Sequence, residues 1–384
     1  MGQENYTPAR QQQGGDYIAD PELTAYVQSV GNKLAAVSDR QLPYEFVILN
    51  DSVPNAWSMP GGKIAFNRGL LYELDSEAEL AAVLGHEIVH AAARHGAKKM
   101  ENGMLLQGAV MATGIAAQDN QYSGLIVGGA QLSSQLIATK FSRNEESEAD
   151  LYGMHYMKKA GYDPSAAVTL QETFVRLSKD QHSNFIQGLF ASHPPSEERV
   201  AANKATLAEL GAGGKVGKEI YAQKVAKLKA TRPAYKAYDE GKQALAKGDV
   251  NQALALARQA VAAEPREARF QELLGDISLK QSRTQEALDY YQRAIDLQPD
   301  YFRPHLQKGI ALNNLDRHAE AEPLLKRSNE LLPTANSYYL LGKIAEDRGD
   351  TETAAQNYRI AAGSDSEIGR ASAAQLENLG TQSH

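Results

Sequence analysis

The stretch His86-Glu87-Ile88-Val89-His90 decides how the rest of this 384-residue chain is interpreted. Two histidines four residues apart on a helix lie on the same face, one turn above the other, so both imidazoles can reach one divalent metal ion. Glu87 follows the first histidine and can lean toward an open metal position, where it would take a proton from a water molecule. This HEXXH pattern predicts a zinc site with a general base beside it. A helix with two packed or solvated histidines is the alternative.

The residues around this stretch favour a helix. Ser76-Glu77-Ala78-Glu79 has the form of a capping box. From there to about Met100 the chain is rich in Ala, Leu and Glu and contains no proline. Gly85 lowers the helix propensity but leaves room beside the metal face. We therefore expect one continuous helix that presents both histidines on one face.

The composition limits the kinds of protein that this chain can be. A formal net charge of −7 and a pI of about 5.8 argue against a nucleic-acid partner. Cysteine is absent, which excludes disulfides, cysteine zinc sites and cysteine nucleophiles, so any metal must be held by His, Asp or Glu. The length and the 42% of hydrophobic residues suffice for two or three domains with real cores.

The N-terminal residues are polar. Residues 1–20 include Gln11-Gln12-Gln13-Gly14-Gly15 and predict a loose arm. Because the start has neither a basic n-region nor an apolar h-region, we expect either a cytoplasmic protein or one whose signal peptide has been removed. An amphipathic helix is expected over 21–38, beginning after Asp20-Pro21.

Three short strands are expected before the HEXXH helix. They cover 44–49, 55–59 and 63–66, with the turn Pro60-Gly61-Gly62 between the last two. Together they predict a small sheet. One edge strand could pair with an extended substrate backbone, or the sheet could only close the core, and the sequence does not separate these two roles.

Two apolar segments follow the HEXXH helix, at 104–117 and 125–138. Each is shorter than the roughly 20 residues that a helix needs to span a bilayer. The pattern indicates a helical hairpin or mobile loop over 104–140 beside the active site, which could touch membrane peripherally or touch substrate, while a buried helix pair without such contacts is the favoured alternative.

A second helix is expected from Ser142 to about Ala160, and it carries the next candidate ligand. Glu146 and Asp150 are four residues apart and share a face, while Glu148 points away. Glu146 can therefore reach the metal, and Asp150 can accept an imidazole N–H and fix its tautomer. The alternative is a solvated acidic face.

The other histidines lack this kind of spacing. His95 is about half a turn from His86 on a continuous helix, so it is expected to face elsewhere, and His155 faces away from Glu146 for the same reason. The remaining ones, apart from one in a proline loop, are expected at the surface: His182, His305, His318 and His384.

That proline loop is Ser192-His193-Pro194-Pro195-Ser196. Its prolines stiffen the backbone, and a histidine held in this way could enter the open metal position and displace the water. Such an enzyme would be self-inhibited; a loop anchor without metal contact is the alternative. Arg199, just beyond, is a candidate for stabilising a tetrahedral oxyanion.

The C-terminal part of the chain repeats. Glycines at 241, 275, 309 and 342 are 34, 34 and 33 residues apart, and each is followed twelve residues later by alanine. A further small residue follows seven positions later, and proline closes the first three units. This is the tetratricopeptide pattern, with four helix pairs and a capping helix over 364–379. A concave groove that binds protein is expected, with a rigid spacer as the alternative.

The motifs, in their order, resemble the gluzincin peptidases related to the CAAX prenyl endopeptidase and HtpX. The matching residues are Asn55-Ala56 with Pro60-Gly61-Gly62, Gly69-Leu70-Leu71, His86 to His90, Glu146 to Asp150, and Ser192-His193-Pro194. The resemblance implies one zinc ion per chain. It assigns the ligands His86, His90 and Glu146, the general base Glu87, the supporting partner Asp150, and the regulatory fourth ligand His193.

With tetratricopeptide units behind the peptidase, the chain resembles periplasmic family members that act as proteases and chaperones in outer-membrane β-barrel assembly. This implies a cleaved signal peptide, unfolded or misfolded barrel proteins as substrates, and docking of the repeats onto the barrel-assembly machinery. The rival hypothesis is a chaperone or assembly factor that works through its repeats with little proteolysis. A cytoplasmic adaptor with a structural metal is weaker, because Glu87 would then have no purpose.

The predicted fold class is mainly α. An α+β protease domain with a small β-sheet and a HEXXH gluzincin fold precedes an all-α tetratricopeptide solenoid. The predicted divisions are an N-terminal arm (1–20), a zinc metallopeptidase domain (21–205), a linker helix (206–232) and a repeat domain (233–384).

Overall fold

The computed structural model describes residues 2–98, 140–179 and 188–382 and divides the chain into two compact units. Of the described residues, the first unit takes 2–6, 16–98, 140–179 and 188–229, and the second takes 7–15 and 230–382. The segment 104–139, for which the sequence predicts a hairpin or loop with peripheral membrane contact, lies outside the described residues. Among the helices that are described, none has the length and apolar character that crossing a bilayer requires.

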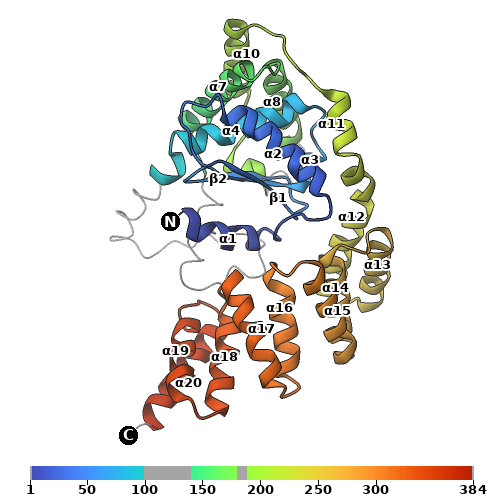
Figure 1. The fold of residues 1–384 in the computed structure, drawn as a ribbon, viewed down its shortest axis with the longest axis vertical. Coiled ribbons are helices and arrows are strands. Elements are labelled where there is room, and N and C mark those ends of the chain that lie inside the picture. Colours follow the sequence, from blue (N-terminus) through green and yellow to red (C-terminus); the bar gives the residue numbers. More distant parts are fainter. Residues whose placement is uncertain (1, 99–139, 180–187, 383–384) are drawn as a thin grey trace. The chain divides into compact units, whose positions relative to one another are not determined.

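The first unit combines a small sheet with helices that pack on it (Figure 1). The elements up to its end are α1 (Gly2–Gln12), α2 (Pro21–Ala35), β1 (Glu45–Leu49), β2 (Ala56–Met59), β3 (Lys63–Asn67), α3 (Arg68–Leu71), α4 (Glu77–Ala92), α7 (Arg143–Lys159), α8 (Ser165–Ser178), α9 (Leu189–Ser192), α10 (Glu197–Leu210) and α11 (Lys218–Lys224).

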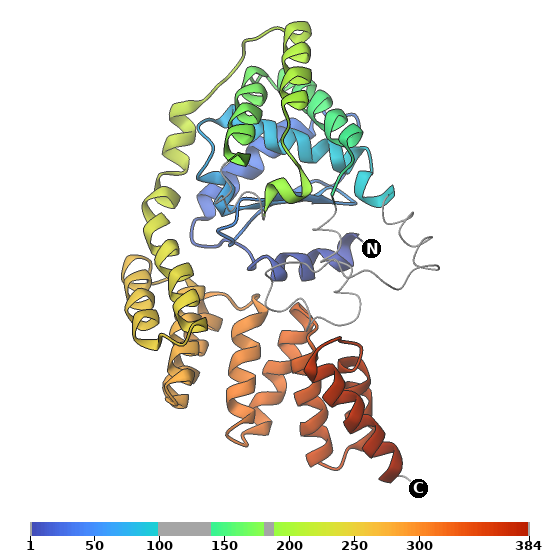
Figure 2. The same ribbon diagram turned by 180° about the vertical axis from the view of Figure 1, so that it is seen from behind.

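The three predicted strands form one mixed sheet in the order β1-β3-β2. Strand β1 pairs in parallel with β3, with Phe46 opposite Ile64, and β2 pairs antiparallel with β3, with Trp57 opposite Ala65. Helix α2 packs on β1 and helix α4 packs on β2 and β3, so nearly all strand residues are buried. The predicted mainly α fold with a small sheet is confirmed; Figure 2 shows the same sheet and helices from behind.

Helices α4 and α7 cross closely because glycine lies at the crossing on both sides. A Cβ atom on Gly153 would lie 3.1 Å from the backbone nitrogen of His86, and one on Gly85 would lie 3.1 Å from the carbonyl oxygen of Gly153. The room beside Gly85 therefore accommodates the α7 backbone. This close approach brings the acidic face of α7 to the histidine face of α4.

Helix α4 is capped differently from what the sequence predicts, and α7 has a capping box for which no prediction was made. At α4, Ser76 accepts the N–H of Glu79, but the Glu79 carboxylate accepts the N–H of Asp75, so only half of the predicted capping box forms. The complete capping box stands at α7, between Ser142 and Glu145. Both helices thus begin at residues that satisfy their free N–H groups.

A buried carboxylate anchors the start of α4. Glu77 accepts hydrogen bonds from the Tyr26 hydroxyl (3.0 Å), the Tyr162 hydroxyl (2.8 Å) and the Lys215 ammonium (2.7 Å). Burial alone would raise the pKa of Glu77, but these donors outweigh it and lower the pKa. Lys215 belongs to the loop between α10 and α11. The range 206–232 is therefore not one linker helix: it contains the end of α10, this loop, α11 and the start of the next helix.

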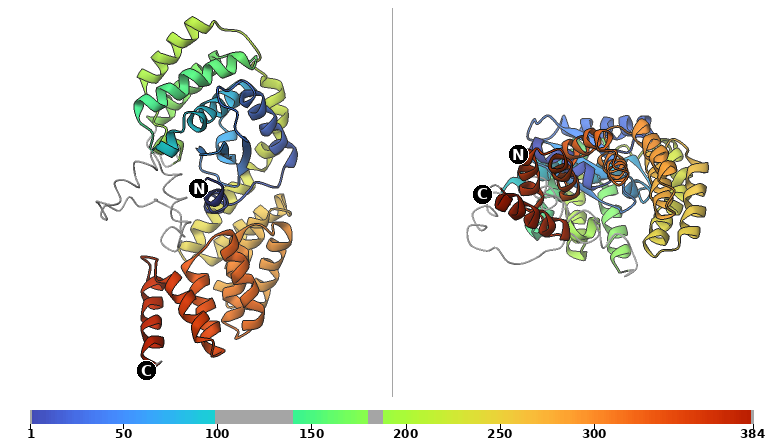
Figure 3. Two further views of the ribbon diagram at one scale, coloured as in Figure 1. Left: turned by 60° about the vertical axis from the view of Figure 1, so that its left-hand side comes forward. Right: turned by 90° about the horizontal axis from the view of Figure 1, so that it is seen from below.

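The second unit is a stack of antiparallel helix pairs followed by one further helix (Figure 3). Its helices are α12 (Ala226–Ala246), α13 (Val250–Ala263), α14 (Ala268–Lys280), α15 (Thr284–Leu297), α16 (Phe302–Asn313), α17 (His318–Leu331), α18 (Ala335–Asp347), α19 (Thr351–Ala361) and α20 (Glu367–Gln382). The predicted four pairs and capping helix are confirmed. The repeated small residues mark crossings: Ala287 and Ala294 are fully buried, and a Cβ on Gly275 would lie 2.5 Å from the Tyr291 ring.

The predicted loose arm is wrong for residues 2–12, which form helix α1. The C-terminal end of this helix belongs to the second unit. There the Gln11 side chain donates a hydrogen bond to the Asp300 carbonyl and accepts the N–H of Phe302, each at 2.8 Å. Arg269 donates to the Gly14 carbonyl at 3.0 Å. Polar glutamines that suggest a flexible arm therefore serve as hydrogen-bonding groups at the turn between two repeats.

Candidate metal centre

Helix α4 supplies the first two side chains of the site. His86 and His90 project from one face with their Nε2 atoms 3.0 Å apart, and both residues are buried. The four-residue spacing places one ring a turn above the other, as the sequence predicts. Their Nε2 lone pairs therefore converge on one position.

Helix α7 adds a carboxylate to this position. Glu146 Oε2 lies 3.6 Å from His86 Nε2, and Glu146 Oε1 lies 3.4 Å from His90 Nε2. The solvated acidic face considered from sequence is wrong for Glu146, because only 2% of its surface is exposed. Burial alone would raise its pKa, but the neighbouring histidines outweigh this, so the pKa of Glu146 lies well below its usual range.

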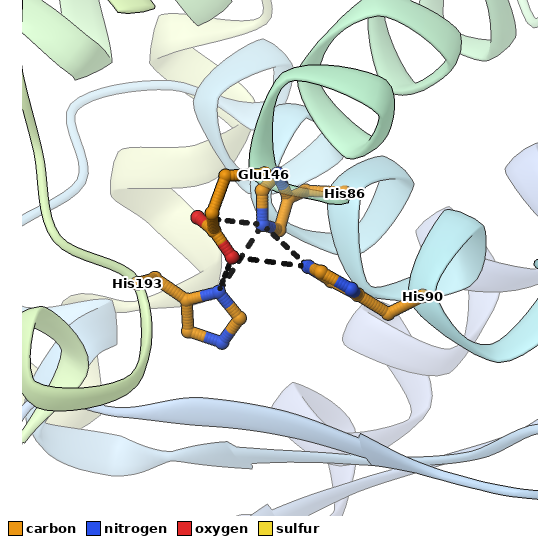
Figure 4. Close-up of side chains that lie close together, drawn as sticks. All are labelled: His86, His90, Glu146 and His193. Atoms are coloured by element: carbon orange, nitrogen blue, oxygen red, sulfur yellow. Dashed lines mark hydrogen bonds and ion pairs between the residues drawn. The ribbon is translucent and has the colours of Figure 1, made fainter. Parts of the chain in front are cut away.

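The histidine of the proline loop completes the cluster (Figure 4). His193 is the C-cap of α9, and its Nδ1 lies 2.9 Å from Glu146 Oε1 and 3.3 Å from His86 Nε2. One donor atom from each of His86, His90, Glu146 and His193 lies within 4.8 Å of the other three. The four groups come from three helical elements that are distant in sequence.

The donor set fits a zinc ion. Nitrogen and carboxylate donors at a buried, four-membered site are the ligands that zinc takes in proteins without cysteine. Burial lowers the pKa of His90 well below its ordinary value, which favours the neutral imidazole that a metal requires. The convergence of four donor groups on one position is the arrangement that binding of one metal ion requires.

Glu87 lies beside this cluster on the same helix. It is 1% exposed, its Oε1 is 3.5 Å from His193 Nε2, and its Oε2 has no hydrogen-bond partner within the described residues. A buried carboxylate oxygen without a donor is costly unless a further group uses it. Glu87 is thus available to a water molecule at the cluster.

Asp150 and Arg199 support the histidines from behind. Asp150 Oδ1 lies 2.9 Å from His86 Nδ1, the contact that the sequence predicts. Arg199 donates to both oxygens of Asp150, at 2.7 and 2.8 Å, and its Nη1 lies 2.7 Å from Glu146 Oε2. Burial would raise the pKa of Asp150, but the charge of Arg199 outweighs it and lowers the pKa to about 2. The oxyanion role of Arg199 stays a prediction, while its contacts are those of a positioning residue.

A mainly apolar pocket opens beside the cluster. It reaches His86, Glu87 and His193 and has a cavity volume of about 50 Å³. Most of its remaining wall is apolar: Val83, Met154, Met157, Leu170, Phe174 and Leu189. Such a pocket can accept an apolar side chain next to the bond that Glu87 would act on.

The structure also shows where the sequence analysis of histidines fails. His95 does not face elsewhere: its Nδ1 lies 2.8 Å from His90 Nδ1, because α4 ends at Ala92 instead of continuing to about Met100. His305 is buried, not at the surface, and its Nε2 lies 2.9 Å from the Pro299 carbonyl oxygen. His182 and His384 lie outside the described residues.

Phe141 was missed by the sequence analysis altogether. Its ring stacks on that of His90, with centroids 3.9 Å apart and an angle of 25° between the planes, and it also lies near His193. An aromatic ring in this place keeps water from one side of the cluster. An isolated phenylalanine before a helix carries no sequence signal for such a role.

Buried histidine and carboxylate donors around a HEXXH helix, with a glutamate beside them that has one unpartnered oxygen, are the features of a metallopeptidase site. Residues 21–207 match Peptidase family M48, and residues 238–302 match the tetratricopeptide repeat. Residues 21–207 therefore form a peptidase family M48 domain, which makes the chain a metalloendopeptidase, and tetratricopeptide repeats follow this domain.

Relatives of known name match this chain over different lengths. The beta-barrel assembly-enhancing protease of Escherichia coli O157:H7 is 27% identical over 383 residues, which cover 85% of this chain and 77% of that protein. The mitochondrial metalloendopeptidase OMA1 of Schizosaccharomyces pombe is 36% identical over 192 residues, which cover 48% of this chain and 53% of that protein. The first likeness extends through the repeats, and the second covers about half of this chain.

Proposed function

We propose that this chain is a zinc-dependent endopeptidase that holds one ion through His86, His90 and Glu146. The observation that carries the proposal is the convergence of these buried donors next to Glu87, which has an unpartnered carboxylate oxygen. When bound, zinc supplies a Lewis acid that lowers the pKa of water and polarises a carbonyl.

The chain's own residues perform the proton transfers. Glu87 is placed to accept a proton from the attacking water and to deliver it to the leaving amine, so that one carboxylate serves as base and then as acid. Asp150 holds the Nδ1–H of His86, which keeps the Nε2 lone pair of His86 directed at the cluster. Arg199 fixes Asp150 and Glu146 together.

We propose further that His193 inhibits this site. Its Nδ1 occupies the position among the donors that a water molecule needs, and its Nε2 faces Glu87. The prolines after His193 and the capped start of α10 hold the loop in place. Movement of this loop would free both the open position and the general base.

The substrates we propose are misfolded or stalled outer-membrane β-barrel proteins, whose assembly the protein would also assist. Support comes from the relatives named beta-barrel assembly-enhancing protease, whose likeness covers both units of this chain. The repeats would dock onto the barrel-assembly machinery, and the place of action would be the periplasm, as the family resemblance implies. A long unfolded chain could add a strand at an edge of the sheet.

A second candidate function is that of a chaperone or assembly factor with little proteolysis. The chaperone hypothesis is favoured by one observation, namely that His193 already fills the fourth position of the cluster. A site shut in this way would leave the repeats to do the work.

The test is the Glu87→Gln variant, compared with Glu172→Gln, which changes an exposed carboxylate on α8. We expect Glu87→Gln to keep wild-type zinc content by metal analysis and to lose about 10²–10⁴-fold in cleavage of a denatured barrel protein, because the general base is gone. Glu172→Gln should match the wild type. A fully active Glu87→Gln variant, or a wild type that binds no zinc, would contradict the proposal.

A further inference from the structure

One buried histidine next to the donor cluster has no part in the mechanism above. His95 is 1% exposed, and it is not among the four donor groups. Its Nδ1 lies 2.8 Å from His90 Nδ1, and its Nε2 lies 3.4 Å from Glu148 Oε2 on helix α7. The three side chains form a line that leads from the cluster to the edge of α7.

A break in α4 creates this arrangement. Residues five apart on a continuous helix do not face each other, so His95 could not reach His90 if the helix went on. The helix ends at Ala92, and Arg94 has a left-handed backbone with φ of 61°. A new helical turn begins there, with the Lys98 N–H donating to the Arg94 carbonyl at 2.9 Å, and this turn carries His95 back beside His90.

The distances fix the direction of the hydrogen bonds. His90 faces the other donors with Nε2, so a ligand lone pair on Nε2 requires the proton of a neutral ring to be on Nδ1. Among the residues that the structure describes, that N–H is directed at the Nδ1 lone pair of His95. The His95 proton is then on Nε2, which is the atom that faces Glu148.

We propose that His95 is a positioning residue of the metal centre, which accepts the Nδ1–H of His90 and directs its own Nε2–H toward the Glu148 carboxylate, 3.4 Å away. It thereby fixes the ligand tautomer and ring orientation of His90. The inference rests on the proposed zinc site and adds His95 to the side chains that support its ligands.

The two ligand histidines of α4 are therefore supported in different ways. The Nδ1 atom of His86 contacts the carboxylate of Asp150 directly, whereas the Nδ1 atom of His90 contacts the imidazole of His95, which in turn faces the carboxylate of Glu148. The side chain of Asp150 is 11% exposed and that of Glu148 is 47% exposed. Because solvent screens an exposed carboxylate, Glu148 contributes less than His95 does.

The experiment measures zinc affinity of the full chain by competition with a chromogenic chelator. His95→Phe keeps the ring volume but leaves the His90 N–H without an acceptor, so we expect zinc binding to weaken about 10–100-fold, the range found for such outer partners. His95→Asn places an amide oxygen where Nδ1 was and should recover most of that loss. The matched control is His155→Phe on α7, which should bind zinc as the wild type does.

Each outcome decides something. Zinc affinity of His95→Phe equal to that of the wild type would overturn the inference, and so would His95→Asn as weak as His95→Phe, because packing would then be the whole role. A wild type without zinc affinity would instead contradict the proposed function. Activity is not needed for either conclusion.

Three further variants keep the inference testable if His95→Phe does not fold. Glu148→Ala changes a half-exposed side chain and should weaken zinc binding severalfold; unchanged affinity would overturn the role of Glu148. Arg94→Gly permits the left-handed turn and should keep zinc affinity, whereas Arg94→Val disfavours that backbone and should lower it. Equal zinc affinity of these two variants would count against the geometry proposed.

Discussion

At the metal centre, a donor side chain is oriented by a second side chain that is not itself a donor. His86 is held by Asp150, and Asp150 is held by Arg199. His193 differs because it touches Glu146 and Glu87 but is placed by its loop. His193 can therefore move away from the cluster while the other three donor groups keep their positions.

The first prediction at this scale concerns that histidine. His193→Ala removes the group that fills the fourth position and faces the general base, so cleavage of a denatured barrel protein should rise severalfold. His155→Ala, on the far part of α7, is the control, and circular dichroism should show both variants folded. Unchanged or lower cleavage by His193→Ala would remove the self-inhibition.

The second prediction at this scale concerns Glu77. Its hydrogen bonds outweigh the effect of burial and lower its pKa below the ordinary value of 4.5. A carboxyl group with a depressed folded-state pKa stabilises the protein above its unfolded pKa, and this stability is lost as the pH falls through the folded pKa. Glu77→Gln should therefore cost about 1–3 kcal/mol in free energy of unfolding near neutral pH.

The pH dependence provides the check on Glu77. The difference in thermal midpoint between wild type and Glu77→Gln should be full above pH 5 and should shrink below the unfolded value of 4.5. Glu172→Gln, an exposed control, should show no comparable difference. If the difference in thermal midpoint between wild type and Glu77→Gln stayed constant from neutral pH down to pH 3, the loss of stability would come from altered packing and not from the charge of Glu77.

Among the elements, the crossing of α4 and α7 determines whether a site exists. The HEXXH helix carries two ligands and the base, but the third ligand arrives only because two glycines let the backbones approach. Side chains at Gly85 or Gly153 would separate the helices and move Glu146 away from His86. The metal site is in this sense a property of a helix pair.

Gly153→Val tests this statement. The added side chain would press on the backbone of α4 and should cost about 1–3 kcal/mol of stability by overpacking. Zinc content of the purified protein should fall in parallel. Gly96→Ala is the control because a Cβ there meets nothing within 4 Å. Full zinc occupancy in Gly153→Val would show that the metal site does not depend on the close crossing of α4 and α7.

In the whole molecule, a peptidase unit and a repeat unit carry separate functions under the proposal. The repeats are stabilised locally, by contacts such as Gly275 against Tyr291, and each helix pair buries its small residues against the next. Binding and cleavage can therefore be lost separately.

Complementation of cells that lack the protein checks this separation. Gly275→Val disrupts a repeat and should leave zinc content and cleavage of a denatured substrate intact while removing function in cells. Glu87→Gln should leave the repeats intact and still fail to clear misfolded barrel proteins. Full rescue by Glu87→Gln would instead favour the chaperone hypothesis.

Much of this protein follows from local sequence. The HEXXH spacing, the strand pattern before it and the 34-residue period depend on residues near one another, and the structure forms the helix, the sheet and the helix pairs that they predict. The domain boundaries and site roles assigned from sequence stay predictions, although the structure brings His86, His90, Glu146 and His193 together.

Tertiary structure alone decided the remaining features. The break after Ala92 and the approach of Phe141 depend on packing between segments that are distant in sequence, and so does the anchoring of Gln11 in the repeats. Periodicity reports which face of a helix is buried, but it does not report the residue at which the helix ends. Local pattern therefore determined the ligands that share a helix, and packing decided which distant side chains support them.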